Sequence, residues 1–207
     1  MGNFNRPILI TGCPSSGQSF LAGILYEFGI VGGTLNENFE NEEVKNLSTT
    51  FLQERNIDKD FITGFPVSTK LMLDKKFKRK VSSTLVKQGH DLSKKWFHFD
   101  SRLCIIWPLW KMGFPKSTWI VVNRRDKNLY EEIKTKFSFT KEEEINSFIN
   151  NYKNQIIETK KNCPQVQEFN FDEFLEGDIK RFKEIIYIAG ITWTENLEEL
   201  VQNYIRR

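Results

Sequence analysis

The chain has 207 residues, of which 39% are hydrophobic and 14% aromatic, a composition typical of a globular protein and not of a disordered one. Thirty Lys and Arg residues stand against 27 Asp and Glu residues, and the net charge of +3 is too small to indicate a general nucleic-acid or membrane binder. No apolar run approaches the roughly 18 residues that a membrane-spanning helix needs. The length suits one domain, which we expect to occupy residues 1–207.

The cysteines and the amino-terminal residues indicate a reducing compartment. Cys13, Cys104 and Cys163 are odd in number and widely spaced, so neither a disulfide framework nor a zinc cluster is expected. Residues 1–6 contain no apolar stretch and do not form a secretory signal. The sequence therefore predicts a cytoplasmic protein without a metal site.

A strand, a glycine-containing loop and a helix are predicted within the first thirty residues. Residues 7–11 form a short apolar run, typical of a strand that is buried on both faces of a parallel sheet. After the loop, apolar residues recur at helical spacing from Phe20 to Phe28, and Gly29 stands where a helix commonly ends.

Strands and helices alternate along the rest of the chain. The long helix that Pro164 closes off is expected to start at a capping box of Thr140 and Glu143, and Pro108 predicts a short or kinked helix. This alternation predicts an α/β fold with a central, mostly parallel sheet. Strands are predicted at 96–100, 119–122 and 166–171, and helices at 42–54, 69–88, 103–110, 178–189 and 195–204. The lysine-rich run at 75–80 is interpreted as a solvated face or, alternatively, as a polyanion contact.

The loop after the first strand has the spacing of a phosphate-binding loop. Its residues are Gly12-Cys13-Pro14-Ser15-Ser16-Gly17-Gln18-Ser19, with Gln18 at the position of the usual lysine. The N–H groups of such a loop converge on an anion at the start of a helix. Without the lysine, the loop loses the contact that spans the β and γ phosphates of a nucleoside triphosphate, but it can still hold a singly esterified phosphate. The alternative is a tight turn without a ligand.

A second anion site is predicted after the third strand, at Asn123-Arg124-Arg125-Asp126. Ligands gather at the carboxyl ends of the strands in open parallel sheets. A nucleoside triphosphatase would place a magnesium-binding Asp at such a strand end, whereas this chain places arginines there, which suit an anion. The alternative is that these arginines pair with surface carboxylates such as Asp126 or Glu131.

Several segments within about residues 7–140 follow the order of a known family's motifs. They are ILITGCPSSG at 8–17, FEN at 39–41, FDSRLC at 99–104, PLW at 108–110 and WIVVNRRD at 119–126. The first resembles the 5′-phosphosulfate loop of sulfotransferases that use 3′-phosphoadenosine-5′-phosphosulfate (PAPS). The others are similar to the G-x-[FW]-E-N, KDPRL, PLW and W-[IV]-x-x-x-R-R-D segments of bacterial and phage sulfotransferase-like proteins.

The resemblance implies a P-loop-like, three-layer α/β fold that works without a metal. It implies that residues 12–19 hold the 5′-phosphosulfate and that Arg124 or Arg125 holds the 3′-phosphate. The implied reaction is in-line transfer of a sulfuryl group from PAPS to a hydroxyl or amine of a small-molecule or carbohydrate acceptor, which leaves 3′,5′-adenosine bisphosphate (PAP). A sulfuryl group carries less charge than a γ-phosphate, so a bridging Mg²⁺ and a lysine are less needed.

Several positions depart from the family's pattern. Ser15 stands where the family has Lys or Arg, and Phe99 and Ser101 replace the Lys and Pro of its KDPR motif. Glu132 or Ile133 stands where the family has a serine after the 3′-phosphate arginine, and a carboxylate there would repel that phosphate unless it turned away. One lost donor costs on the order of 10²–10³ in turnover, so the loss of two could leave a binder with negligible catalysis.

His98 and Asp100 are the candidate catalytic bases. Side chains alternate along a strand, so both lie on one face near its carboxyl end, where either could take the proton of the acceptor. Histidine is the better matched to neutral pH. The alternatives are a packed histidine and a structural ion pair between Asp100 and Arg102.

Three functions are consistent with the sequence: a PAPS-dependent sulfotransferase, a non-catalytic nucleotide-binding accessory protein of the same fold, and a P-loop kinase. Gln18 and the lack of an Asp after the third strand argue against the kinase. The polar stretch 32–64 is expected to form part of the acceptor wall, because it is too long for a simple connection. No nucleic-acid or membrane partner is expected.

Overall fold

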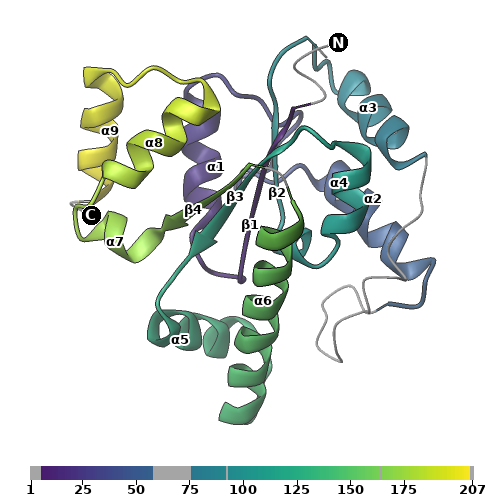
Figure 1. Ribbon diagram of the computed structural model, residues 1–207, viewed down its shortest axis with the longest axis vertical. Helices are drawn as coiled ribbons and strands as arrows, with labels where there is room; N and C mark the ends of the chain where they lie inside the picture. Colours follow the sequence, from purple (N-terminus) through teal and green to yellow (C-terminus); the bar gives the residue numbers. More distant parts are fainter. Residues whose placement is uncertain (1–5, 58–75, 92, 164, 206–207) are drawn as a thin grey trace.

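The computed structural model describes residues 6–57, 76–91, 93–163 and 165–205 (Figure 1). The strands in these residues are β1 (Ile8–Gly12), β2 (Phe97–Phe99), β3 (Thr118–Asn123) and β4 (Val166–Asn170). The helices are α1 (Gln18–Glu27), α2 (Glu42–Gln53), α3 (Phe77–Lys87), the 3₁₀ turn η2 (Ser101–Cys104), α4 (Trp107–Gly113), α5 (Asp126–Lys136), α6 (Glu142–Asn162), α7 (Phe171–Leu175), α8 (Lys180–Ala189) and α9 (Glu195–Ile205). The predicted helix at 69–88 is present from Phe77, and residues 69–75 lie outside the described residues. No helix in the described part of the chain has the length and apolar composition needed to cross a bilayer.

The strands form one sheet in the order β2-β1-β3-β4, and every neighbouring pair is parallel. In the middle of the sheet Ile10 lies opposite Phe99 on one side and Ile120 on the other. Parallel pairing requires crossover connections, so the carboxyl ends of all these strands lie at one edge. The predicted α/β fold with a central parallel sheet is confirmed.

Helices cover both faces of the sheet because apolar side chains point to both. Leu9 and Trp119 belong to a buried cluster shared with α2, α3, α4, α5 and α6. Their neighbours Ile10 and Ile120 belong to a second cluster, shared with α1, α7, α8 and α9. Figure 1 shows α1, α8 and α9 on one side of the strands and α2, α3 and α4 on the other. The result is the predicted three-layer arrangement.

Two helices follow β3, whereas the sequence analysis predicts only the second. The unpredicted helix, α5, starts at Asp126, and only Arg124 and Arg125 separate it from the end of β3. Its buried residues are only Leu129 and Ile133, so its apolar stripe is too short to stand out from the surrounding polar sequence. This helix matters for the site, because it carries two charged side chains toward the loop after β1.

The predicted capping box of Thr140 and Glu143 is wrong. The carboxylate of Glu144 instead accepts from the N–H groups of Thr140 and Lys141, at 3.2 Å each. The helix therefore begins one residue later than the box requires, and Glu144 satisfies N–H groups just ahead of its first turn.

The start of α4 and the end of β4 are each set by a nearby side chain. Pro108 stands in the first turn of α4, where its missing N–H is not needed, so it begins a separate helix instead of kinking one. β4 ends at Asn170, one residue before the predicted end at Phe171, because the Asn170 side chain accepts from the Asp172 N–H and caps α7.

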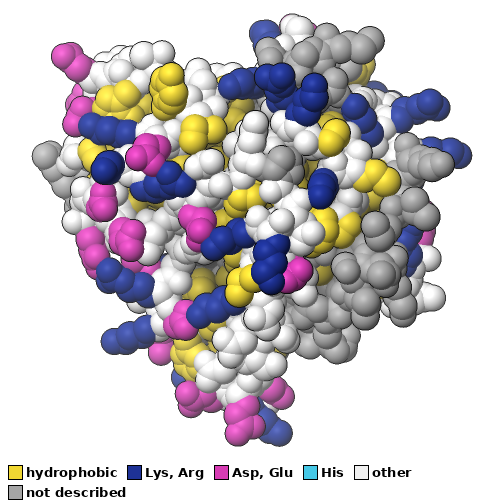
Figure 2. Space-filling view, viewed as in Figure 1, with side chains coloured by type: hydrophobic (Ala, Val, Ile, Leu, Met, Phe, Trp, Pro, Cys, Tyr) yellow, Lys and Arg dark blue, Asp and Glu magenta, His cyan; other side chains and the backbone are white. Residues whose placement is uncertain are grey.

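Lys and Arg side chains gather over α3 in the space-filling view (Figure 2). The helix contains no acidic residue, and Arg79 and Lys80 are exposed. These exposed side chains agree with the interpretation of the lysine-rich run as a solvated face.

Gly17, between β1 and α1, combines a left-handed backbone with close packing. Its φ is +99°, and a β-carbon there would lie 2.6 Å from the ring of Phe171. Gly29 after α1 also has a positive φ, +81°, but a β-carbon there would meet nothing within 4 Å. A substitution at Gly29 therefore costs only the free energy of a left-handed backbone, whereas one at Gly17 also costs the free energy of the contact with Phe171.

We expect Gly17→Ala to lower the free energy of unfolding by about 2–5 kcal/mol, because a left-handed alanine costs about 1–2 kcal/mol and overpacking adds about 1–3 kcal/mol. Gly29→Ala, which pays only the conformational cost, should lose about 1–2 kcal/mol. Urea denaturation of both variants measures the difference. Equal losses of unfolding free energy in the two variants would show that the Phe171 ring moves aside without a measurable cost.

Candidate functional site

The loop between β1 and α1 turns several N–H groups toward one side. Ser15 and Gly17 have φ of +69° and +99°, and they alternate with Pro14 and Ser16, whose φ is not positive. Such alternation of backbone sign makes an anion-binding nest. Among the described residues, no acceptor contacts the backbone N–H groups of Ser15, Gly17, Gln18 and Ser19, although that of Ser16 donates to the Cys13 carbonyl at 3.1 Å. The loop is therefore open to an anion at the start of α1.

Gln18, at the usual lysine position, is part of the scaffold. Its side-chain amide donates to the Cys13 carbonyl and to the Ser101 hydroxyl, both at 3.1 Å. The residue is only 5% exposed. Gln18 therefore ties the loop to the turn after β2.

The two arginines after β3 point in different directions. Arg124 donates to the backbone carbonyl of Ser15 at 2.9 Å, and its side chain is 18% exposed. The Arg125 guanidinium pairs with Glu176, and its side chain is 53% exposed. The structure thus brings Arg124, and not Arg125, to the loop.

Carboxylates lie close to Arg124. Glu132 on α5 is 3.5 Å from its guanidinium and Asp172 on α7 is 3.6 Å from it. Asp172 also accepts from the backbone N–H of Arg125 and from the side chain of Asn128. The carboxylate of Glu132 does not turn away from the arginine, and it offsets part of the positive charge beside the loop.

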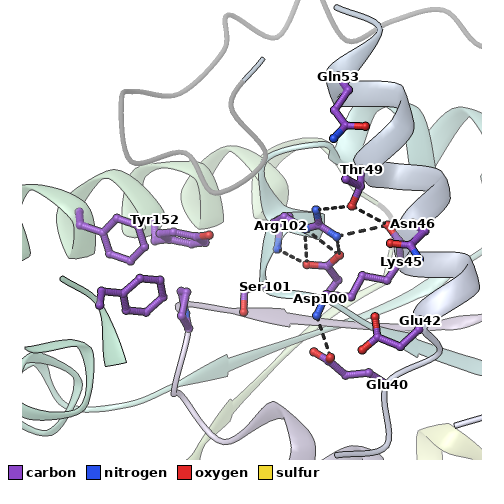
Figure 3. Close-up of a pocket in the computed structure, with 13 residues that line it drawn as sticks. Glu40, Glu42, Lys45, Asn46, Thr49, Gln53, Asp100, Ser101, Arg102 and Tyr152 are labelled. Carbon is purple, nitrogen blue, oxygen red and sulfur yellow. Dashed lines mark hydrogen bonds and ion pairs between the residues drawn. The ribbon is translucent and has the colours of Figure 1, made fainter. Parts of the chain in front are cut away.

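A cavity of about 560 Å³, which we call the α2 pocket, opens next to the loop (Figure 3). Its volume is in the range of small-molecule sites. Tyr152 lies on one side of it, and Lys45, Asn46 and Thr49 of α2 lie on the other. The lining residues are Pro14, Glu40, Glu42, Lys45, Asn46, Thr49, Gln53, Asp100, Ser101, Arg102, Phe137, Phe148 and Tyr152. Residues between 40 and 53 of the stretch 32–64 thus contribute to the lining of a pocket, and residues 58–64 lie outside the described residues. That the stretch forms part of an acceptor wall stays a prediction.

Asp100 and Arg102 form a buried ion pair at the floor of the α2 pocket. The guanidinium approaches the carboxylate through Nε at 3.0 Å and Nη2 at 2.6 Å, and it also donates to Thr49 at 2.9 Å. Burial alone would raise the pKa of Asp100, but the charge and hydrogen bonds of Arg102 outweigh it and hold that pKa below its usual value. This is the structural pair that the sequence analysis gives as an alternative, and it joins the turn after β2 to α2.

His98 lies in the core on the same face as Asp100. Its ring stacks on Trp110 with centroids 4.9 Å apart, and neither ring nitrogen has a partner among the described residues. Burial lowers the pKa of His98 to about 4, against the opposing attraction of Asp100. The imidazole is therefore neutral at pH 7, and it is not among the residues that line the α2 pocket. A role as catalytic base stays a prediction for both His98 and Asp100, and only Asp100 reaches the pocket.

Cys13 in the loop is a buried thiol. Burial raises the pKa of Cys13 far above its usual value, so the side chain is neutral at physiological pH. Cys104 is similar, and burial raises its pKa to about 12. Among the described residues, no group of three or more His, Cys, Asp or Glu side chains could hold a metal ion.

Lys136 and Lys45 lie beside the candidate site, and no prediction from the sequence places them there. The Lys136 ammonium lies 3.1 Å from the Ser15 hydroxyl, across 121 residues of sequence. Lys45 pairs with Glu40 at 2.7 Å at the edge of the α2 pocket. No spacing motif marks either lysine, and both lie on the carboxyl-end side of the sheet only because helices bring them there.

Solved structures of sulfotransferase domains share this fold. The sulfotransferase domain of the olefin synthase from Synechococcus PCC 7002 superposes with a TM-score of 0.58 at 12% identity, over 93% of this chain and 75% of that domain. Sulfotransferase STF1 from Mycobacterium tuberculosis gives 0.54 at 10% identity, over 96% and 71% of the two chains. The sulfotransferase domain of the curacin biosynthetic pathway gives 0.53 at 10% identity, over 92% and 75%. At these identities the similarity establishes the fold.

No protein-family profile matches the chain, and no curated protein matches it by sequence. The similarity is therefore one of overall fold, and it extends over more than nine-tenths of this chain.

The burial of a neutral His98 has a consequence for stability. An unfolded histidine takes up a proton below its usual pKa of about 6.5, whereas folded His98 does so only near pH 4. The folded pKa is lower, so the unfolded state binds more protons between these values, and stability falls as the pH drops from 6.5 to 4.

We expect wild type to lose roughly 3 kcal/mol more than His98→Leu between pH 6.5 and pH 4, because the variant has no imidazole to protonate on unfolding. Urea denaturation at half-unit pH steps measures both curves. Parallel curves over this range would mean that His98 is accessible to water in the folded protein.

Proposed function

We propose that this chain is a sulfotransferase that takes its sulfuryl group from PAPS and transfers it to a hydroxyl or amine acceptor. The observation that carries the proposal is the open row of N–H groups at Ser15, Gly17, Gln18 and Ser19, because an anion is what such a row binds best. The sulfotransferase-domain fold supports the same ligand class.

The residues around the loop fit the 5′-phosphosulfate end of such a donor. The Ser16 hydroxyl is buried without a hydrogen-bond partner among the described residues, so it is available to an anion in the loop. A β-carbon on Gly12 would lie 2.4 Å from that hydroxyl and from the Val122 carbonyl, so only glycine leaves room there. When bound, PAPS would supply the sulfuryl group and a bisphosphate leaving group.

The acceptor is proposed to bind in the α2 pocket. Pro14 and Ser101 line the pocket where it meets the loop, so an acceptor there would lie beside the anion site. The aromatic side chains of Phe137, Phe148 and Tyr152 would cover an apolar part of the acceptor and keep water away from it. The amide and hydroxyl groups of α2 would bind its polar part. This division suits a small-molecule or carbohydrate acceptor.

A second function, nucleotide binding without transfer, has specific support. The loop contains no Lys or Arg, and the Glu132 carboxylate lies within 3.5 Å of Arg124. Both features weaken stabilisation of charge on a leaving group. The kinase alternative is less favoured, because β3 ends at Asn123, whose side chain donates to Glu168 and leaves no carboxylate on that strand for Mg²⁺.

We expect PAP, at about 100 times its dissociation constant, to raise the stability of the folded protein by about 2.7 kcal/mol, which thermal unfolding detects. ATP with Mg²⁺ should have little effect, because the loop lacks the lysine that spans β and γ phosphates. Transfer of labelled sulfate from PAPS to a panel of alcohols, amines and sugars then separates enzyme from binder. A response to ATP with Mg²⁺ alone would contradict both proposals.

We expect Arg124→Ala to weaken PAP binding by roughly 1.5–3 kcal/mol and Arg125→Ala to change it by less than about 0.5 kcal/mol, because only Arg124 reaches the loop. Calorimetric titration with PAP and with AMP measures both variants. If Arg124 holds the 3′-phosphate, its loss should affect PAP far more than AMP. Equal losses for both nucleotides would place Arg124 at the 5′ anion instead.

A further inference from the structure

The loop after β1 needs a cation that its own sequence does not supply. Residues 12–19 contain no Lys or Arg. Gln18, at the lysine position, is held by Cys13 and Ser101 and is 5% exposed. Phosphate-binding loops normally add a lysine charge to their N–H groups. If this loop binds a multiply charged anion, the additional positive charge must come from another element.

Two cations from other elements converge on Ser15. The Arg124 guanidinium donates to its backbone carbonyl at 2.9 Å, and the Lys136 ammonium donates to its hydroxyl at 3.1 Å. Lys136 is the last residue of α5. Its hydrogen bond is to a side chain at the rim of the loop, so the ammonium lies at the rim.

Lys136 neutralises the net negative charge that the other side chains around Arg124 would leave beside the loop. Arg124 faces two carboxylates, Glu132 at 3.5 Å and Asp172 at 3.6 Å. Without Lys136 this group would carry one cation against two carboxylates, and an anion would be repelled. With Lys136 the positive and negative charges balance, so no net negative charge repels an anion that binds to the open N–H groups.

The Lys136 ammonium is held in place and still available to a ligand. Glu132, one helical turn earlier, lies 3.7 Å from it. The Lys136 side chain is 58% exposed. Its ammonium can therefore exchange its hydrogen bond to the Ser15 hydroxyl for one to a ligand oxygen while it stays hydrated. A flexible, hydrated ammonium of this kind acts as a point charge on an anion.

We propose that Lys136 supplies, from the end of α5, the cation of the anion-binding loop, and that it binds the same 5′ anion as the loop's N–H groups. That this anion is the 5′-phosphosulfate of PAPS rests on the proposed function. The contact itself requires only an anion of phosphate or sulfate type, so inorganic pyrophosphate is a probe that does not depend on the donor's identity.

The test measures the dissociation constants of pyrophosphate and PAP for wild type, Lys136→Gln and Lys134→Gln. We expect Lys136→Gln to bind both ligands roughly five- to tenfold more weakly, and with a smaller dependence on salt, because one exposed charge is lost. Lys134 is an exposed lysine of the same helix whose ammonium lies 6.0 Å from the Tyr130 ring, so Lys134→Gln should leave binding unchanged. Equal urea midpoints for the two variants exclude a folding effect.

A second variant, in which a lysine is placed in the loop itself, tests whether binding can be restored as well as lost. Ser15→Lys in the Lys136→Gln background returns a cation to the loop and should restore binding of pyrophosphate to within about twofold of wild type, because a lysine ammonium acts as a point charge on an anion. Wild-type affinity in Lys136→Gln would overturn the inference and leave the proposed function standing. If Lys136→Gln lost pyrophosphate binding but wild type did not bind PAP, the inference about Lys136 would stand and the proposed function would be overturned. If wild type bound neither ligand, both would be overturned.

Discussion

The site depends on backbone N–H groups at the start of α1 that have no acceptor among the described residues. Ser15 and Gly17 take positive φ values to present them, and this conformation is stable because the surrounding structure holds it. Gln18 fixes one side of the loop and Arg124 fixes the other. The remaining features of the site, the α2 pocket and the charges on α5, are arranged around these donors.

The loop and the pocket are linked through the turn after β2. Ser101 accepts from Gln18, and the neighbouring pair of Asp100 and Arg102 reaches α2 at Thr49. A buried pair of this kind is costly to break from one side, since the other charge is left uncompensated. The position of α2, and with it one wall of the pocket, is therefore coupled to the loop.

The fold was largely predictable because its elements have local patterns. The runs at 7–11 and 119–122 are continuous and apolar, and the loop has the spacing of a known motif in the right context. α5 was not predictable from its short apolar stripe, which amounts to Leu129 and Ile133. The prediction of the capping box was wrong by one residue, since three acidic residues stand in succession at 142–144 and the sequence does not show which of them accepts.

The site was less predictable, because side-chain direction depends on tertiary contacts. The sequence presents Arg124 and Arg125 as equivalent, and only the packing of α7 and Glu176 separates them. The approach of Lys136 to Ser15 has no local signal at all, since the two residues are 121 positions apart and only the folded chain brings them together.

The two walls of the α2 pocket have different freedom to change. Thr49 on α2 receives a hydrogen bond from Arg102, so its replacement would disturb the scaffold. Phe137 and Phe148 contact each other at 5.3 Å between ring centroids and have no part in that network. A change at half-buried Phe137 can therefore alter the shape of the pocket without breaking the hydrogen bonds that hold the loop, so this side of the pocket should diverge in sequence faster than the loop.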